Sequence, residues 1–215
     1  MRYKLLLILL TFPLFLFAQK LEEDKRTFQG SFFLGLNPSQ VDGDELSGFR
    51  QFGLSVGPSV AFRLKNRFFF NMELLYSAVG SAWHPDQNLY PNQNYDLKLR
   101  YVAIPMYVNY HDKDGKVRLG AGLSYGRLFS AHETIDFYKV DIINPEFHKS
   151  DLTLFGDLQY LFNKHIGLNL RFSNSLLYIR YIPTTRYAGF GYSSGPSDGL
   201  YQYNKFITVR GFYVF

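Results

Sequence analysis

The fold is decided by the stretch Phe68-Phe69-Phe70-Asn71-Met72-Glu73-Leu74-Leu75-Tyr76-Ser77-Ala78, in which two kinds of side chain alternate. Every even-numbered position is apolar or aromatic, whereas the odd-numbered set contains Asn71, Glu73 and Ser77. A helix would scatter each set around its axis, but a strand separates them because successive side chains point to opposite faces. The stretch therefore predicts a β-strand with one apolar face and one mixed face.

The same alternation recurs in seven other segments. Their expected ranges are Phe28–Asn37, Gln51–Leu64, Lys98–Tyr110, Val117–Phe129, Asp151–Phe162, His165–Ile179 and Tyr203–Phe215. Each range provides the roughly 9–11 residues that a tilted strand needs to cross a membrane. Apolar side chains that are spread through alternating strands are typical of burial in lipid rather than in a core. We therefore predict an all-β fold, an eight-stranded antiparallel up-and-down transmembrane β-barrel, over residues 28–215.

The connections between these segments alternate in length. Residues 65–67, 111–116 and 163–164 form short links, whereas the stretches near 38–50, 80–97, 130–150 and 180–202 are long and polar or rich in glycine. Short periplasmic turns and long outer loops mark outer-membrane barrels, so we expect four long outer loops. A soluble lipocalin-like barrel is the competing fold, and it would carry the reverse pattern, with polar side chains outward.

The beginning of the chain has the pattern of an export signal. Met1-Arg2-Tyr3-Lys4 is basic, Leu5–Phe17 is apolar, and Ala18-Gln19 follows. An apolar run of this length is too short for a spanning helix, which needs roughly 20 residues, and fits a secretory signal peptide. We expect residues 1–18 to be the signal peptide, cleaved near Ala18, and residues 19–27 to be a short periplasmic segment.

Composition excludes several classes of function. The chain has no cysteine, which excludes a lipoprotein anchor, thiol catalysis and thiolate metal sites. The formal net charge is +5, and removal of Arg2 and Lys4 with the signal peptide lowers it to about +3. This mild charge, without a basic cluster in the sequence, predicts no nucleic-acid partner, and nothing in the chain indicates a cofactor.

Three stretches resemble a known family. They are the signal ending Leu16-Phe17-Ala18-Gln19, the segment Leu99–Tyr110 with Pro105 inside an aromatic and aliphatic strand, and the closing Tyr213-Val214-Phe215. The chain resembles the small outer-membrane β-barrel proteins of Gram-negative bacteria that include PorT-like proteins and are often labelled "porin family". The resemblance implies an outer-membrane location, and Tyr213 and Phe215 resemble the insertion signal read by the barrel-insertion machinery. The glycine of that signal is displaced by one position, to Gly211. Pro105 lacks the N–H that a strand ladder uses, so we predict a bulge at this position.

The inward faces carry charges at one level. Glu73, Asp157, Arg171 and Arg210 each lie about five or six residues from the periplasmic end of their strands, so at roughly 3.3 Å per residue they share one height. An eight-stranded lumen is narrow enough for side chains to meet across it. We predict a structural ion-pair network that fills the lumen, with a transport or proton-relay role as the alternative.

Other motifs carry weaker signals. Gly122-Leu123-Ser124-Tyr125-Gly126 matches a nucleophile elbow but lies within a predicted strand rather than a strand-to-helix turn. His132-Glu133 with Asp136 or His148 lacks helical metal-ligand spacing, so we predict no metal site and no catalytic residue. Aromatic residues of the expected loops are candidates for binding a partner, or else belong to an interfacial aromatic belt: Trp83, Tyr90, Tyr95, Tyr187, Phe190 and Tyr192.

These features predict a non-enzymatic outer-membrane barrel with a surface-binding role or a structural role in the envelope or in secretion. A narrow channel or transport component is one alternative, and a lipid-modifying outer-membrane enzyme is another. The expected partners are outer-membrane lipid, the barrel-insertion machinery and an unidentified envelope or surface protein. We expect the protein to be a monomer.

Overall fold

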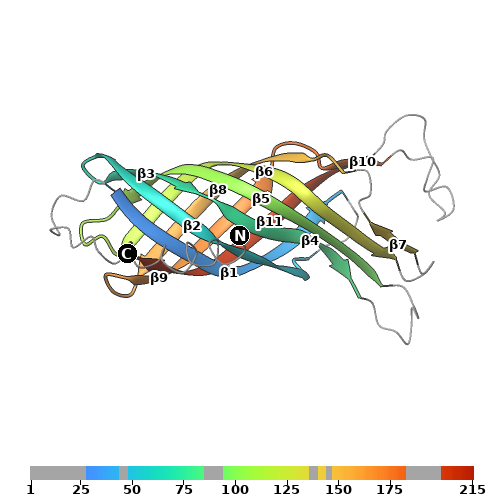
Figure 1. Ribbon diagram of the computed structural model, residues 1–215, viewed down its shortest axis with the longest axis horizontal. Coiled ribbons are helices and arrows are strands. Elements are labelled where there is room, and N and C mark those ends of the chain that lie inside the picture. Colours follow the sequence, from blue (N-terminus) through green and yellow to red (C-terminus); the bar gives the residue numbers. More distant parts are fainter. Residues whose placement is uncertain (1–27, 44–47, 85–93, 136–139, 144–146, 183–199) are drawn as a thin grey trace, which may run out of the picture.

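The computed structural model describes residues 28–43, 48–84, 94–135, 140–143, 147–182 and 200–215. These residues form strands arranged as an elongated barrel (Figure 1). The strands are β1 (Phe28–Asp42), β2 (Gln51–Lys65), β3 (Phe68–Glu73), β4 (Leu75–Trp83), β5 (Tyr95–His111), β6 (Val117–Ile135), β7 (Val140–Ile143), β8 (Ser150–Leu161), β9 (Ile166–Ser175), β10 (Arg180–Ile182) and β11 (Leu200–Val214). No helix in the described part of the chain is long and apolar enough to cross a membrane.

The strands close into a ring of eight. Each is antiparallel to its neighbour in the order β1, β2, β3 with β4, β5, β6, β8, β9 and β11, and β11 returns to pair with β1. The strands β3 and β4 count as one wall because their pairing with β5 keeps the same register on both sides of Leu74. The predicted eight-stranded antiparallel barrel is therefore confirmed.

The two faces of the wall have the predicted character. Outward positions carry large exposed apolar side chains, such as Leu34, Leu54 and Ile104, whereas inward positions are often polar and buried, such as Asn37, Asn169 and Thr208. A soluble barrel would show the reverse pattern, because its apolar side chains would fill the interior. The outward surface is built for an apolar surrounding.

Most strands reach further than the sequence indicated at the end with the long connections, whereas β9 ends at Ser175, before the predicted end at Ile179. β1 continues to Asp42, β5 begins at Tyr95 and β6 continues to Ile135. The strands β7 and β10 lie inside stretches that were predicted as loops, and they pair with β6 and β11. The predicted loop ranges were therefore too wide, because polar residues beyond the apolar band continue the same backbone ladder.

Proline positions explain a break in one wall. Pro105 was predicted to mark a bulge, but the register of β5 against β3, β4 and β6 is continuous there, and the irregularity with β6 lies at Arg100/Tyr101. Instead, the opposite strand is interrupted at Leu74. The bulge prediction was wrong, because the missing N–H of proline weakens the neighbouring strand rather than displacing its own.

Candidate functional site

The four predicted lumen charges meet in the middle of the barrel. Glu73 accepts hydrogen bonds from Arg171, whose Nη2 lies 2.8 Å from Oε1, and from Arg210, whose Nη1 lies 3.0 Å from Oε2. Arg171 also donates through Nε to Oδ1 of Asp157 at 2.7 Å. The structure thus places Arg171 between the two carboxylates, with β3, β8, β9 and β11 each contributing one charge.

Neutral side chains complete the network. Tyr107 donates its hydroxyl hydrogen to Glu73 at 2.5 Å, and Asn169 donates to Asp157 at 3.0 Å while accepting from Nε of Arg210 at 2.9 Å. Gln159 donates to Asp157 at 2.8 Å. The sequence analysis missed these three residues, although each occupies an inward position of its strand. They carry no charge, so only their alternation with outward apolar residues marked them.

The network is neutral and its charges are packed against aromatic rings. Two guanidinium groups balance two carboxylates, and Glu73, Asp157, Arg171 and Arg210 are each at most 4% exposed. The guanidinium carbon of Arg171 lies 4.1 Å from the ring centre of Phe155, and that of Arg210 lies 4.4 Å from that of Phe33. Buried charges are tolerated where they are paired and fully hydrogen-bonded, and these contacts meet that condition.

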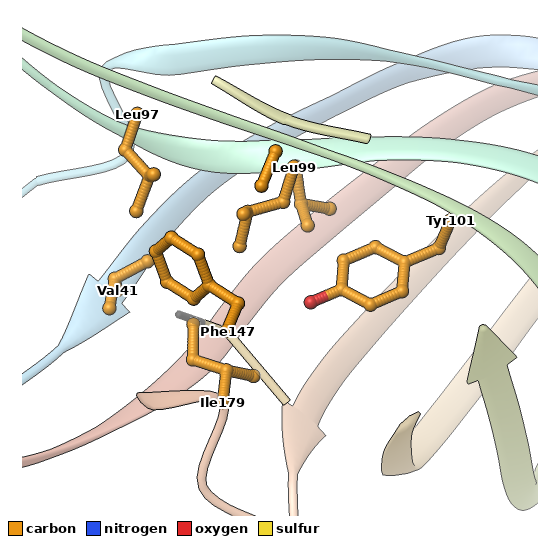
Figure 2. Close-up of a cluster of buried hydrophobic side chains, with 8 residues drawn as sticks. Val41, Leu97, Leu99, Tyr101, Phe147 and Ile179 are labelled. Atoms are coloured by element: carbon orange, nitrogen blue, oxygen red, sulfur yellow. The ribbon is translucent and has the colours of Figure 1, made fainter. Parts of the chain in front are cut away.

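Apolar side chains close the lumen towards the long connections. A cluster of buried residues fills this end (Figure 2): Val41, Val79, Leu97, Leu99, Tyr101, Ala131, Phe147 and Ile179. Phe147 and Ile179 come from segments outside the strands, and the backbone joins them there, because His148 donates to the carbonyl of Ile179 at 2.7 Å. This cluster is hereafter called the outer plug, and the sequence analysis did not predict it.

A second ion pair supports the outer plug. Arg180 donates to both carboxylate oxygens of Glu133, at 2.8 and 3.0 Å, and its Nε donates to Gln202 at 2.9 Å. Tyr95 donates its hydroxyl hydrogen to the same carboxylate at 2.8 Å. Bidentate arginine–carboxylate pairs fix geometry as well as contributing energy. Glu133, which the sequence offered as a weak metal-ligand candidate, is thus engaged in holding β6 to β10.

The end with the short turns is also filled. Phe33, Leu161, Phe212 and Val214 form a second buried cluster, here called the lower plug. Beside it, the ring of Phe69 stacks on His111 with centres 4.0 Å apart. Between the network and the outer plug lies a cavity of about 40 Å³, lined by residues that include Tyr101, Asp151, Arg171 and Arg210. A volume of this size holds only a few water molecules.

The predicted loop aromatics have different fates. Tyr95 lies in strand β5 rather than in a loop, and it packs against the outer plug. Trp83 ends strand β4 and is half-buried. Tyr90, Tyr187, Phe190 and Tyr192 lie outside the described residues, as do the signal peptide and residues 19–27. The closing aromatics Tyr213 and Phe215 are 46% and 48% exposed, with ring centres 5.5 Å apart. Their service as an insertion signal stays a prediction.

Comparison with known proteins identifies a family and related folds. A family model described as "Outer membrane protein beta-barrel domain" matches residues 17–179. No curated protein matches the chain. Among solved structures, the chain is similar to Ail, the attachment invasion locus protein of Yersinia pestis, with 11% identity and a TM-score of 0.48, over 87% of this chain and 98% of that one.

Two further structures show a similar arrangement. Neisserial surface protein A shares 13% identity at a TM-score of 0.44, over 87% of this chain and 96% of that one. The N-terminal β-barrel domain of OprF from Pseudomonas aeruginosa shares 9% identity at a TM-score of 0.36, with the same coverage of 87% and 96%. These likenesses support no conclusion about ligand or activity, so the assignment rests on the family model and on the ring of eight strands. The chain belongs to the family of outer-membrane β-barrel domain proteins, and its place is the outer membrane of the cell.

Proposed function

We propose that this protein is a closed, non-enzymatic barrel that acts through its outer surface and binds an envelope or surface partner there. The observation that carries the proposal is the filling of the lumen at three successive levels. The outer plug, the charged network around Glu73 and the lower plug follow one another along the barrel. A passing solute would have to displace all three.

The alternatives fit the described residues less well. A channel needs a continuous polar path, but both plugs are apolar and the network between them has its charges paired. A hydrolytic enzyme needs a histidine or carboxylate available to a substrate. Glu133 is held by Arg180, and Glu73 and Asp157 are held by Arg171, so none of these carboxylates is available. Within the described part of the chain, no three His, Asp or Glu side chains gather as metal ligands would.

Conductance in planar bilayers tests the closed lumen. The purified full-length protein is expected to give no steady single-channel current, because the cavity holds only a few waters and both plugs exclude ions. The current of the unaltered protein is compared with that of the variant Leu97→Ser/Leu99→Ser, which replaces two wholly buried residues of the outer plug with small polar ones. A steady open-pore current from the unaltered protein would contradict the proposal.

A further inference from the structure

A basic patch lies on the outward face near the outer rim. It consists of Lys98 and Arg100 on β5 and Arg127 on β6, and all three side chains are exposed. They share the outward face with Val102 and Ile104 on β5 and with Leu123 and Tyr125 on β6. The three cations are hereafter the rim patch.

Strand register brings the three cations together. Arg127 is opposite Val102, and Arg100 is opposite Ser130 across the same pair of strands. The two arginines are therefore diagonal neighbours, with Cβ atoms roughly 5–8 Å apart. Lys98 is two residues from Arg100 on the same face, about 6.6 Å away. One small anionic group is within reach of all three side chains.

A bulge shapes the wall at this point. The register between β5 and β6 shifts between Arg100 and Tyr101, because Phe129 is the extra residue on β6. The ring of Phe129 lies on the outward face, 6.0 Å from that of Tyr76 on β4. Bulges re-aim neighbouring side chains. Here the shift makes Ser130, rather than Phe129, the partner of Arg100, and it leaves the ring of Phe129 on the outward face between the two arginines.

The height of the rim patch matches the edge of the hydrocarbon layer. Tyr110 is the last outward residue of β5 at the opposite end of the same strand, ten residues from Arg100. At roughly 3.3 Å per residue and a tilt of about 40°, this separation corresponds to about 25 Å along the membrane normal. That is the height of the apolar band of an outer-membrane barrel. The guanidinium groups thus reach the headgroup level of the leaflet on the side of the long connections.

The patch is not neutralised by its neighbours. Among the described residues, none of the three cations forms a salt bridge, and Arg127 donates to the hydroxyl of Ser150, at 3.2 Å. Tyr125 shares that hydroxyl at 3.0 Å. On the far side of the ring the rim differs, because Lys205 pairs with Asp42, and the exposed rings of Tyr178 and Tyr181 each contact the ring of Tyr201. Lys98, Arg100 and Arg127 therefore form one group of cations without a carboxylate partner, and Arg50 before β2 and Lys149 before β8 are further exposed cations at this end of the barrel.

We propose that the rim patch binds a phosphate monoester on the headgroup of a glycolipid in the outer leaflet, such as that of lipid A. A monoester carries nearly two negative charges at neutral pH, which suits three clustered cations better than the single charge of a phosphodiester. Arginine forks match phosphate oxygens in pairs, and the apolar residues beneath the patch lie where the acyl chains of the same lipid would run. The proposal does not depend on the closed lumen, so a conducting barrel would leave it standing.

Lipid binding in defined membranes tests this site. The full-length protein is reconstituted in phosphatidylcholine nanodiscs, and titrated with diphosphoryl lipid A or with phosphatidylglycerol. The variant K98Q/R100Q/R127Q is expected to bind diphosphoryl lipid A about 100-fold more weakly than the unaltered protein, at about fivefold per cation. The matched control R67Q/K113Q/K116Q removes three cations at the opposite end of the barrel and is expected to change the affinity less than twofold.

Two outcomes would overturn the proposal. Equal affinity of the triple variant and the unaltered protein for lipid A would show that the patch is not the site. Equal affinity of the unaltered protein for phosphatidylglycerol and lipid A would show attraction to any anionic surface rather than to a phosphate monoester. Heat-modifiable migration on gels checks folding of each variant. If the triple variant does not fold, Arg100→Gln alone, with an expected loss of about fivefold, decides the question.

Discussion

Glu73 holds two guanidinium groups and one phenol at the centre of the lumen. Its carboxylate accepts from Arg171, Arg210 and Tyr107. Removing one member of such a network costs far more than the network contributes in total, since the remaining charges stay buried without a counter-charge. The energetic role of Glu73 is therefore visible in combinations of substitutions rather than in one alone.

A double-mutant cycle measures this coupling. Glu73→Gln and Arg171→Met each leave one uncompensated charge in the lumen and are each expected to lower the free energy of unfolding by about 3–5 kcal/mol. The double variant keeps Asp157 and Arg210, which balance each other, so its loss should be smaller than the sum by at least about 2 kcal/mol. Urea unfolding in detergent micelles followed by tryptophan fluorescence gives the four values. Asp114→Asn, in an exposed turn, is the control and should change stability little. Additive losses would contradict a coupled network.

Two prolines interrupt one wall from both sides. Leu74 donates its N–H to the carbonyl of Pro58 at 3.0 Å, and in a hydrogen-bonded antiparallel pair the partner returns a bond. Pro58 has no N–H to return. On the other side, register places Pro105 opposite Glu73. His111 donates its N–H to the carbonyl of Arg67, which makes these two residues a hydrogen-bonded pair. Such pairs recur at every second residue, so the backbone of Glu73 also points towards β5. Its partner there, Pro105, has no N–H to donate. The break between β3 and β4 follows from these two missing bonds.

Restoring one donor should repair the ladder. In Pro58→Ala the new amide of residue 58 faces the carbonyl of Leu74 and is expected to exchange with solvent deuterium at least 100-fold more slowly than an exposed turn amide such as that of Asp114. Stability should change little, because a hydrogen bond worth about 1 kcal/mol is offset by the freedom that the unfolded chain regains when proline is removed. Hydrogen exchange followed by NMR in micelles reads out the amide directly. Fast exchange at residue 58 would show that the break has another cause.

The alternation of side chains predicted the strands and their two faces, because each strand segment repeats with a period of two residues. It predicted the charged centre for the same reason: Glu73, Asp157, Arg171 and Arg210 all stand on inward positions. The outer plug was not predicted, because Phe147 and Ile179 lie outside the strands. The alternation of side chains within strands therefore gives no information about which way these two residues point. Register-dependent features were not predicted either. Arg100 and Arg127 are 27 residues apart in the sequence, and the register of β5 against β6 makes them diagonal neighbours.

The whole barrel has an apolar belt on its outward surface, and its lumen is filled by different groups of side chains at different heights. The belt faces outward on every wall, and the interior passes from the lower plug through the charged network to the outer plug. The walls rise beyond the belt on the side of the long connections, where β7 and β10 continue them. A barrel of this kind presents a rigid rim above the membrane surface, and the filled interior supports that rim from inside.

The depth of the barrel in the membrane is measurable through Trp83, which is the only tryptophan of the chain. Trp83 lies 15 residues along the wall from Phe68, so at the same rise and tilt it stands roughly 38 Å above the lower edge of the belt, beyond the apolar layer of about 25 Å. Its fluorescence in vesicles of lipids brominated in mid-chain should fall by less than about a fifth relative to unbrominated vesicles. The matched variant Trp83→Phe/Leu123→Trp moves the probe to an outward position within the belt, where we expect more than half of the fluorescence to be lost. Strong quenching of Trp83 together with weak quenching at position 123 would place the membrane around the rim instead of the belt.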